Sequence, residues 1–402
     1  MATQSRRKFI RQGSAALTAT AFLPLLSRAQ LFKGDLIRVG LIGSGSRGTG
    51  LAMLMGKMAG LQVVACCDIL PQNLANAVKK AAPGAKTYTD YQRLLEDKSI
   101  DAVIIATPLY LHAKMAGEAL QAGKHVYLEK AMGFTVDDVL QLAQTVRNNP
   151  QLVFQLGYQY RYYGLYKKIK EVIQQNWLGK ITHIESQYNR NSDWRNPVAD
   201  PSQERIINWR MYKEYCGGPL SELCSHQIDM IHYLLDVHPL SAVGMGGNNY
   251  WKDGRTTFDH IHAIYEYPGG IKSSVNSSLS NAFDGYNIKI FGDRATVEIQ
   301  REEAFIYAES TNNERGTVDG VTGATVSAVT QGAAQKINFL KPGEELLEPT
   351  TYALTDFRDC ILQNRKAAAG AESGASSAIA IIMGNKAAET GEKQYWPNNY
   401  SI

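Results

Sequence analysis

The feature that most constrains the fold is a glycine-rich turn between an apolar strand and a helix. From residue 37 the chain reads IRVGLIGSGSRGTG, so the pattern G-x-G-x-x-G follows the strand directly. Gly43 permits a tight turn, Gly45 lets the backbone approach a pyrophosphate, and Gly48 lets helix and strand pack closely. The free N–H groups at the helix start, where Ser46 and Arg47 lie, suit a phosphate ligand. The motif in this context predicts a dinucleotide-binding Rossmann domain.

A second apolar strand, LQVVACCD, ends in Asp68, twenty residues after Gly48. A carboxylate at this place accepts hydrogen bonds from the ribose hydroxyls and repels a 2′-phosphate. No basic residue follows it at positions 69–71. The expected cofactor is therefore NAD, with NADP less favoured.

Two further apolar runs, DAVIIATPLYLH and GKHVYLEKAM, end in polar residues. Open parallel sheets bind ligands at the carboxyl ends of their strands. We therefore expect these strand ends to line the cofactor cleft, with the side chains of Thr107, Pro108, His112, Glu129 and Lys130. Helical segments alternate with the strands (72–82, 91–96, 113–122 and 136–148), and a last strand is expected at 152–157. The fold class is α/β, with the NAD-binding domain at 31–157.

Residues 1–29 have the pattern of a twin-arginine export signal. SRRKFIR at residue 5 precedes an apolar run at 15–26 and the small-residue sequence Ser-Arg-Ala. This segment holds five basic residues and no acid, so the net charge falls from +4 to −1 without it, which excludes a nucleic-acid partner on charge grounds. We expect a periplasmic protein, exported folded, with no membrane span after signal removal; an uncleaved N-terminal anchor is the alternative.

A second, α+β domain is expected at 158–402. It begins near Arg161 and carries a polar stretch with Trp194, Arg195 and Trp209. Aromatic faces beside hydrogen-bonding arginines suit a sugar, which shows C–H faces and hydroxyl edges. These four residues are therefore candidate substrate contacts. The alternative is an irregular surface excursion.

The segment GGPLSELCSHQIDM is expected to be helical, because Pro219 stands at its start and apolar residues recur with helical spacing. On an α-helix, Glu222, His226 and Asp229 fall at i, i+4 and i+7 and share one face. An acid–histidine–acid stripe is costly to bury for packing alone. It suits a proton relay in which His226 exchanges the substrate hydroxyl proton. A surface pair at i, i+4 is the alternative.

The rest of the second domain reads as a large, open, mostly antiparallel sheet of about six strands. The expected strands are 180–188, 242–245, 260–267, 270–279, 286–292 and 295–300, and one face of the sheet is free for a partner subunit. Residues 316–335 read as a mobile loop. Two closing helices, 352–363 and 375–389, are expected to pack on the first domain. His260 and His262 share a strand face without an evident third ligand, so no metal site is expected.

Taken together, the motifs GSGSRG, ATPLYLH, GKHVYLEKAM, GYQYR, GGPLSELCSHQIDM and SSAIAIIMGNKAAETG resemble the Gfo/Idh/MocA family in order and spacing. The resemblance covers nearly the whole chain after residue 29. It implies a Rossmann domain and an α/β domain whose open sheet makes dimers or tetramers. It also implies a tightly held nicotinamide cofactor and a small carbohydrate substrate, a sugar or polyol.

The resemblance also implies roles for single residues. Lys130 matches the lysine of the family's E-K-P motif, which contacts substrate and assists proton transfer, although Ala131 replaces the proline and its fixed φ. His226 matches the catalytic histidine. Glu222 stands where many members carry aspartate, and Asp229 matches an acid that contacts substrate.

Three functions follow from these motifs. The first is an NAD(H)-dependent oxidoreductase that moves a hydride to or from a carbon of a sugar, polyol or glycoside. The second is an NAD-dependent glycoside hydrolase that oxidises, eliminates, hydrates and reduces again; the glycine- and histidine-rich stretch of such enzymes is not evident here. The third is a non-catalytic NAD-binding sensor, against which Lys130 and the Glu222/His226 pair argue.

Overall fold

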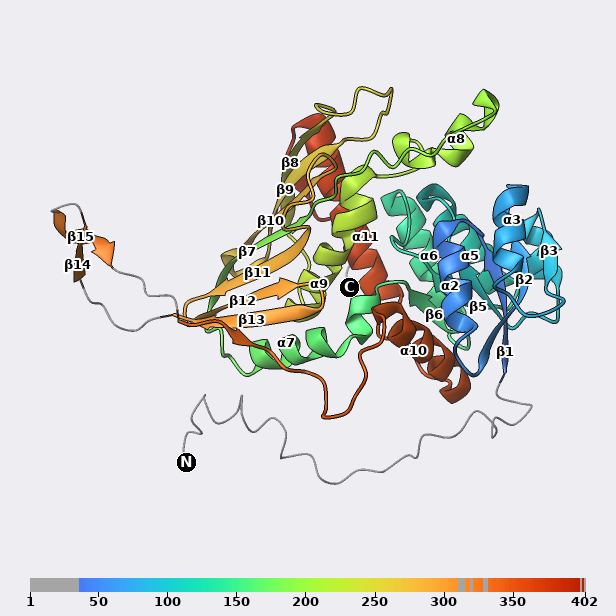
Figure 1. Cartoon of the computed structure of the whole chain (residues 1–402), viewed down its shortest axis with the longest axis horizontal. Helices are drawn as coiled ribbons and strands as arrows, with labels where there is room; N and C mark the ends of the chain where they lie inside the picture. Colours follow the sequence, from blue (N-terminus) through green and yellow to red (C-terminus); the bar gives the residue numbers. More distant parts are fainter. Residues whose placement is uncertain (1–35, 310–314, 319–320, 328–331, 398–399, 401–402) are drawn as a thin grey trace.

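A computed structural model of the chain describes residues 36–309, 315–318, 321–327, 332–397 and 400. Figure 1 shows two bodies side by side, a parallel-sheet domain coloured blue to cyan and a broad sheet coloured green to orange, with α9 and α11 between them. The predicted export signal, 1–29, lies outside the described residues and stays a prediction. In the described part, no helix has both the length and the apolar character that a bilayer crossing needs.

The first domain is a six-stranded parallel sheet with the strand order β3-β2-β1-β4-β5-β6. Its strands are β1 (Ile37–Ile42), β2 (Leu61–Cys67), β3 (Lys86–Tyr88), β4 (Ala102–Ile105), β5 (His125–Leu128) and β6 (Phe154–Leu156). The connecting helices are α2 (Ser46–Met55), α3 (Pro71–Val78), α4 (Tyr91–Glu96), η1 (Leu109–Leu111), α5 (His112–Gln121) and α6 (Val136–Asn148). The order reverses between β1 and β4, which creates a crevice at their carboxyl ends.

Local chemistry explains how well these elements follow the sequence pattern. β1 and β4 are almost wholly buried, as expected for a sheet with helices on both faces. α6 begins where Thr135 and Asp138 form a reciprocal capping box, at the predicted residue. The short, mostly exposed β3 was not predicted, because three residues give no periodicity.

The second domain is a nine-stranded sheet with the order β16-β13-β12-β11-β7-β10-β9-β8-β17. Its strands are β7 (Ile181–Tyr188), β8 (Ser241–Gly247), β9 (His260–Glu266), β10 (Lys272–Ser278), β11 (Tyr286–Gly292), β12 (Ala295–Gln300), β13 (Glu303–Ala308), β16 (Gln335–Lys336) and β17 (Gln394–Tyr395). Only the β7–β10 pair is parallel. The predicted fold class is therefore confirmed, and the estimate of about six strands was too low because β13, β16 and β17 were missed.

The helical segments of the second domain lie before the sheet, between its strands and after it. They are η2 (Gln159–Tyr162), α7 (Gly164–Gln174), η3 (Pro201–Gln203), α8 (Glu204–Ile207), η4 (Trp209–Met211), η5 (Leu220–Cys224), α9 (Ser225–Leu235), η6 (Pro268–Gly270), α10 (Pro349–Gln363) and α11 (Ala371–Thr390). The segment with α8 leaves the sheet domain and reaches over the first domain (Figure 1).

The prediction of a loop at 316–335 was wrong where the structure describes the segment. β14 (Arg315–Val318) and β15 (Val321–Ser327) pair as a two-stranded antiparallel sheet. Threonine and valine alternate with small residues in this stretch, and β-branched side chains favour extended backbone. The loop reading gave the glycines more weight than the β-branched residues between them.

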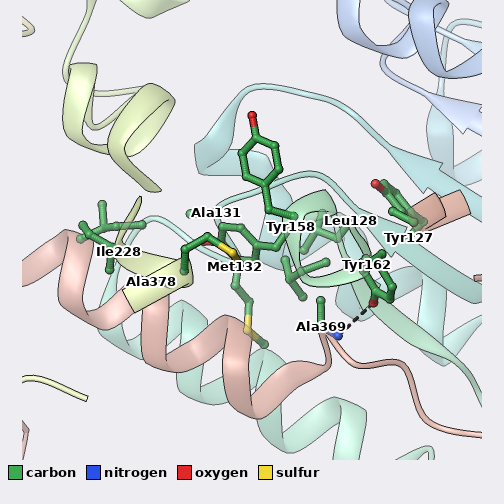
Figure 2. Packing of buried hydrophobic residues seen from close by; sticks show 14 of the residues in the cluster. Tyr127, Leu128, Ala131, Met132, Tyr158, Tyr162, Ile228, Ala369 and Ala378 are labelled. Atoms are coloured by element: carbon green, nitrogen blue, oxygen red, sulfur yellow. Dashed lines mark hydrogen bonds between the residues drawn. The ribbon is translucent and has the colours of Figure 1, made fainter. Parts of the chain in front are cut away.

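The two closing helices join the domains. α10 packs against α2 of the first domain, as predicted, and also against η2, and Gln155 of β6 donates a 2.8 Å hydrogen bond to the carbonyl oxygen of Ala353. α11 packs on α6 but also on β8 and α9, so it belongs to both domains. Figure 2 shows the shared core, where Met132 of the first domain lies near Ile228 of α9 and Ala378 of α11.

Candidate active site

The glycine-rich turn is built so that two positions accept only glycine. Gly43 has φ +87°, and a Cβ there would lie 2.7 Å from the Ala106 carbonyl group at the end of β4. A Cβ on Gly48 would lie 2.0 Å from the carbonyl oxygen of Gly43. Any larger residue would push α2 away from the strand ends, so the two glycines keep helix, turn and sheet in contact.

The turn delivers the start of α2 as an anion site. Gly45 is the N-cap and supplies no side-chain acceptor, so the first N–H groups of the ten-residue helix, beginning at Ser46, lack a capping side chain. These groups and the helix dipole fit a pyrophosphate. The Arg47 side chain is not reserved for this anion site, because its Nε donates a 2.8 Å hydrogen bond to Glu129.

Asp68 is held rigidly at the end of β2. One carboxylate oxygen accepts hydrogen bonds from the Ser44 amide (2.8 Å) and the Asn73 side chain (3.3 Å), and the other accepts one from the Leu70 amide (2.8 Å). The carboxylate also faces a cavity of about 230 Å³. Its place and its fixed orientation fit the ribose of a dinucleotide, as the sequence predicted.

The same cavity is lined by both domains. Gly43, Gly45, Thr107 and Pro108 contribute from the strand ends, and Arg205, Ile206, Trp209 and Tyr215 contribute from the segment that carries α8 and η4. Trp209 therefore lies against the nucleotide cavity, although its sequence context suggested a sugar contact. Its face is also covered by the guanidinium of Arg210, 4.1 Å from the ring centroid.

His112 is a positioning residue. It is buried, with Nδ1 2.7 Å from the carbonyl oxygen of Ala131 and Nε2 2.9 Å from that of Thr107. Both ring nitrogens are therefore occupied by the backbone of neighbouring strand ends. The prediction of a direct cofactor contact is corrected to a link between two segments that line the cleft.

Lys130 joins the two domains at the end of β5. Its Nζ donates a 2.7 Å hydrogen bond to the backbone carbonyl oxygen of Glu222, and the Lys130–Ala131 peptide bond is cis. Among the described residues, Lys130 has no carboxylate partner. Its other two donor positions are thus available to a ligand in the cleft.

The predicted stripe of Glu222, His226 and Asp229 is not a relay. Residues 220–224 form the π-helical turn η5, and α9 begins only at Ser225. The wider turn separates side chains that an α-helix would stack. The carboxylate of Glu222 instead accepts a 2.9 Å hydrogen bond from Arg210. Burial raises the pKa of Glu222, but the charges of Lys130 and Arg210 outweigh it and hold the pKa below its usual value.

His226 is nearly buried at the start of α9, and its Nδ1 has no hydrogen-bond partner among the described residues. The rings of Tyr160 and Tyr158 lie edge-on at centroid distances of 5.3 and 6.2 Å. Burial, followed by the positive charge of Lys130 and of nearby arginines, holds the pKa of His226 well below its ordinary value. The imidazole is therefore neutral near pH 7 and able to accept a proton.

Asp229 and Arg161, both predicted to contact substrate, contact each other. Nε and Nη2 of Arg161 donate hydrogen bonds of 2.8 Å to the two carboxylate oxygens, and Ser377 of α11 adds a third of 2.9 Å. The exposed fractions of the two side chains are 8% and 0%. This correction follows from burial, because an unpaired charge here would be costly, so each of the two charges needs the other.

Trp194 and Arg195 support the excursion that carries α8. Arg195 pairs with Glu204 (2.5 Å) and donates to the carbonyl oxygen of Asp253 (2.9 Å). Trp194 is partly buried against the core, with φ +60°. Neither residue lines the nucleotide cavity. Their predicted contact with substrate is replaced by a bracing role that positions Arg205 and Trp209 over the first domain.

Several residues near the site were not predicted as site residues from the sequence, although Arg190 and Arg210 belong to the polar stretch that was expected to suit a sugar. They are Tyr158 and Tyr160 beside His226, Arg210 beside Glu222, and the group of Tyr188, Arg190, Tyr286 and Arg301. The last group, of Tyr188, Arg190, Tyr286 and Arg301, comes from the end of β7, the start of β11 and the β12–β13 turn. Their only sequence signal is that each lies at or just beyond the end or the start of a strand, which does not say which strands are neighbours.

Comparison with known proteins assigns both domains. Residues 37–158 match the family model of the oxidoreductase family with an NAD-binding Rossmann fold. Residues 166–298 match the GFO/IDH/MocA C-terminal domain. The chain carries both domains of the Gfo/Idh/MocA oxidoreductase family. This family has an NAD-binding domain of the kind that the glycine-rich turn and Asp68 build here.

Curated relatives of this Gfo/Idh/MocA chain carry two kinds of name. Glycosyl hydrolase family 109 protein 1 of Bacteroides fragilis is 32% identical over 228 residues, which cover 53% of this chain and 48% of the relative. Inositol 2-dehydrogenase of Salmonella typhimurium is 29% identical over 207 residues, which cover 51% and 54%. The chain thus spans about half the length of these curated relatives.

Solved structures share the fold across nearly the whole chain. A levoglucosan dehydrogenase in complex with NADH and levoglucosan superposes with a TM-score of 0.73 at 20% identity, covering 90% of this chain and 100% of the other. The myo-inositol 2-dehydrogenase from Lactobacillus plantarum gives 0.68 at 20% identity, covering 90% and 99%. At this identity the likeness establishes the two-domain architecture.

Proposed function

We propose that this protein is an NAD(H)-dependent oxidoreductase that acts on a hydroxyl-bearing carbon of a sugar, polyol or glycoside. The observation that carries the proposal is the junction of Lys130, Glu222 and His226, a cation and a neutral imidazole beside a glycine-rich nucleotide site. The dehydrogenase names among the relatives support the same reading.

The residues divide the chemistry between them. A dinucleotide whose pyrophosphate lies at the glycine-rich turn would supply the nicotinamide carbon that takes up or returns a hydride. Lys130, which keeps two donor positions beyond its hydrogen bond to the Glu222 carbonyl oxygen, would stabilise the alkoxide that forms as the hydroxyl loses its proton. His226, kept neutral, would hold that proton on its imidazole. Glu222, ionised and fixed by Arg210, keeps the π-helical turn and its carbonyl oxygen in place for Lys130.

The preference for NAD rests on Asp68. Replacing it with asparagine removes the charge that repels a 2′-phosphate and keeps an acceptor for the Ser44 amide. We expect the ratio of the NADP to the NAD dissociation constant to fall at least about tenfold, measured by titrating the purified protein with each nucleotide. Asp90→Asn, at an exposed N-cap outside the cavity, is the matched control. An equal loss of affinity for both nucleotides in Asp68→Asn would contradict the assignment.

The neutral state of His226 has a consequence for the pH profile. A histidine with an ordinary pKa of about 6.5 would lose roughly three quarters of its neutral form at pH about 6. Because burial depresses the pKa of His226, its base form persists below that pH, and kcat/KM for oxidation is expected to change less than about twofold between pH 8 and 6. His183→Gln, an exposed histidine on β7, should leave the profile unchanged. An inflection near the ordinary value would refute this role.

We also propose a homo-oligomer, a dimer or tetramer, that forms through the open face of the nine-stranded sheet. Tyr265 faces α11, while Val243, Met245 and Ile264 lie on the opposite face, and Met245 is 79% exposed. Val243 and Ile264 are cross-strand partners, so the apolar side chains are contiguous. Met245→Glu with Ile264→Glu should lower the molar mass in light scattering. Leu362→Glu on α10 is the control, and an unchanged mass would exclude this face.

The reaction itself is tested with a panel of free sugars and glycosides in heavy-oxygen water, read by mass spectrometry. Loss of two hydrogens from an otherwise intact substrate, with reduction of the bound nucleotide, is the expected result. Free sugar that carries the heavy label without net nucleotide reduction would make the protein a glycoside hydrolase, the other name among its relatives. No change with any sugar would leave nucleotide binding without catalysis.

A further inference from the structure

Two arginines of the second domain converge on a single phenol oxygen. Arg190, just after β7, donates a 2.8 Å hydrogen bond to the hydroxyl of Tyr188, and Arg301, in the β12–β13 turn, donates to the same hydroxyl. Both guanidinium groups also lie over the Tyr188 ring, 5.2 and 5.4 Å from its centroid. Two positive charges are thus held within a few ångströms of one atom.

Neither arginine forms an ion pair with an acid in the part of the chain that the structure describes. Glu302, the residue next to Arg301, is exposed; against the lowering effect of burial, its charge helps to raise the pKa of Arg301, but the two side chains form no ion pair. The Nε of Arg301 is buried and has no acceptor among the described residues. Four other arginines of the domain are paired: Arg161 with Asp229, Arg195 with Glu204, Arg210 with Glu222 and Arg255 with Asp253. Arg294, at the other end of β12, also has no ion pair among the described residues, but it is exposed and stands alone. What distinguishes Arg190 and Arg301 is that both meet at one hydroxyl.

Like charges at this separation repel, and neither guanidinium has an ion-paired carboxylate among the described residues, so an anionic ligand would stabilise the cluster. Guanidinium groups are planar forks that match a carboxylate or sulfate in two-point contacts. Arg301 is held in this place by the fold, because Tyr166 donates a 3.2 Å hydrogen bond to its backbone oxygen and its φ is +58°. The cluster is thus positioned before any ligand arrives.

The cluster adjoins the candidate active site. Arg301 lies over the ring of Tyr286 (5.8 Å), Tyr286 contacts Tyr160 (5.4 Å), and Tyr160 contacts His226 (5.3 Å). The charges of both Arg190 and Arg301 act on His226. The two arginines therefore lie on the sheet side of His226, and their charges reach it.

We propose that the substrate is an anionic sugar, whose acidic group is bound by Arg190 and Arg301 while its reacting hydroxyl faces Lys130 and His226. A carboxylate, as in a hexuronate, and a sulfate ester share the required chemistry. The proposal deepens the proposed function and rests on it for the identity of the reacting group. The charge preference itself is a property of binding and can be measured without turnover.

The test is a set of binding titrations with the nucleotide-loaded full chain. Methyl glycosides of gluco, galacto and manno configuration are each used in three forms: the neutral hexose, the hexuronate and the 6-sulfate. In at least one configuration, an anionic form is expected to bind at least about tenfold more tightly than the neutral sugar. Tighter binding of the hexuronate identifies a carboxylate substrate, and tighter binding of the sulfate identifies a sulfate ester.

Variants show whether these arginines cause the preference. Arg190→Gln and Arg301→Gln should each remove most of it, while Arg301→Lys should retain part of it. Arg294→Gln is the matched control, because Arg294 is an exposed arginine in the turn at the other end of β12. The inference is overturned if no anionic form binds more tightly than its neutral partner, or if the preference survives in both glutamine variants. Oxidation of neutral sugars alone would overturn this inference but leave the proposed function standing. Tight anion binding without any redox change would support the anion site but contradict the proposed function.

Discussion

Replacing Lys130 with methionine is expected to lower kcat/KM for the oxidised sugar about a thousandfold. Proton transfer assisted by a positioned side chain contributes on the order of 10²–10⁴ in rate, and Lys130 is the cation proposed to stabilise the alkoxide. Among the described residues the side chain makes one hydrogen bond, to the Glu222 carbonyl oxygen, so its loss should leave folding largely intact. Steady-state kinetics with the substrate found in the sugar panel give the measurement.

Two controls make the result specific. Lys80→Met removes an exposed lysine of the same domain and should leave kcat/KM within about twofold. Nucleotide affinity of Lys130→Met, measured by titration, should stay close to that of the unchanged protein, because the glycine-rich turn and Asp68 are untouched. A Lys130→Met enzyme that retains its kcat would remove this lysine from the chemistry.

The second large effect is on stability. Asp229→Leu is expected to lower the free energy of unfolding by about 3–5 kcal/mol, because it leaves the guanidinium of Arg161 buried without a counter-charge. The paired change Arg161→Met with Asp229→Leu removes both charges and should recover most of that loss. Urea unfolding of the single and double variants gives the coupling free energy between the two residues.

The same variants separate a structural role from a substrate contact. If Asp229 binds substrate, the double variant should lose activity even where its stability is restored. If the ion pair only holds η2 against α9, activity should return with stability. Ser377→Ala, which removes one hydrogen bond to Asp229, is a milder control with an expected loss of about 1 kcal/mol.

Much of the fold could be predicted from the sequence. Strands 286–292 and 295–300 and helices 91–96 and 136–148 have the bounds that their patterns indicated. Each depends on residues within one element, where periodicity, capping and turn residues act together. β3, β16 and β17 were missed because two or three residues carry no period, and β13 because it follows β12 after a turn of only two residues.

The residues of the candidate site show the same difference between local features, which the sequence predicts, and distant contacts, which it does not. Gly43 and Asp68 follow the adjacent parallel strands β1 and β2, Gly48 lies in the helix between them, and their relation follows from one strand–turn–helix–strand unit. Asp229, by contrast, was read from helical spacing alone, and its partner Arg161 lies 68 residues away in another element. The π-helical turn at Leu220–Cys224 changes which side chains share a face. The i, i+4 spacing used for the prediction applies to an α-helix and does not describe this turn.

The sequence by itself determined the nucleotide-binding turn, the parallel sheet and the presence of Lys130 and His226 at strand and helix ends. These are local consequences of glycine geometry, apolar runs and strand carboxyl ends. Only the tertiary structure decided that Arg161 neutralises Asp229, that Trp209 covers the nucleotide cavity, and that two arginines meet at Tyr188. The meeting of the two arginines depends on the strand order, in which β7 lies beside β11 and β11 beside β12. The other two contacts depend on how helical segments far apart in the chain pack together, and burial determines which charges must find a partner.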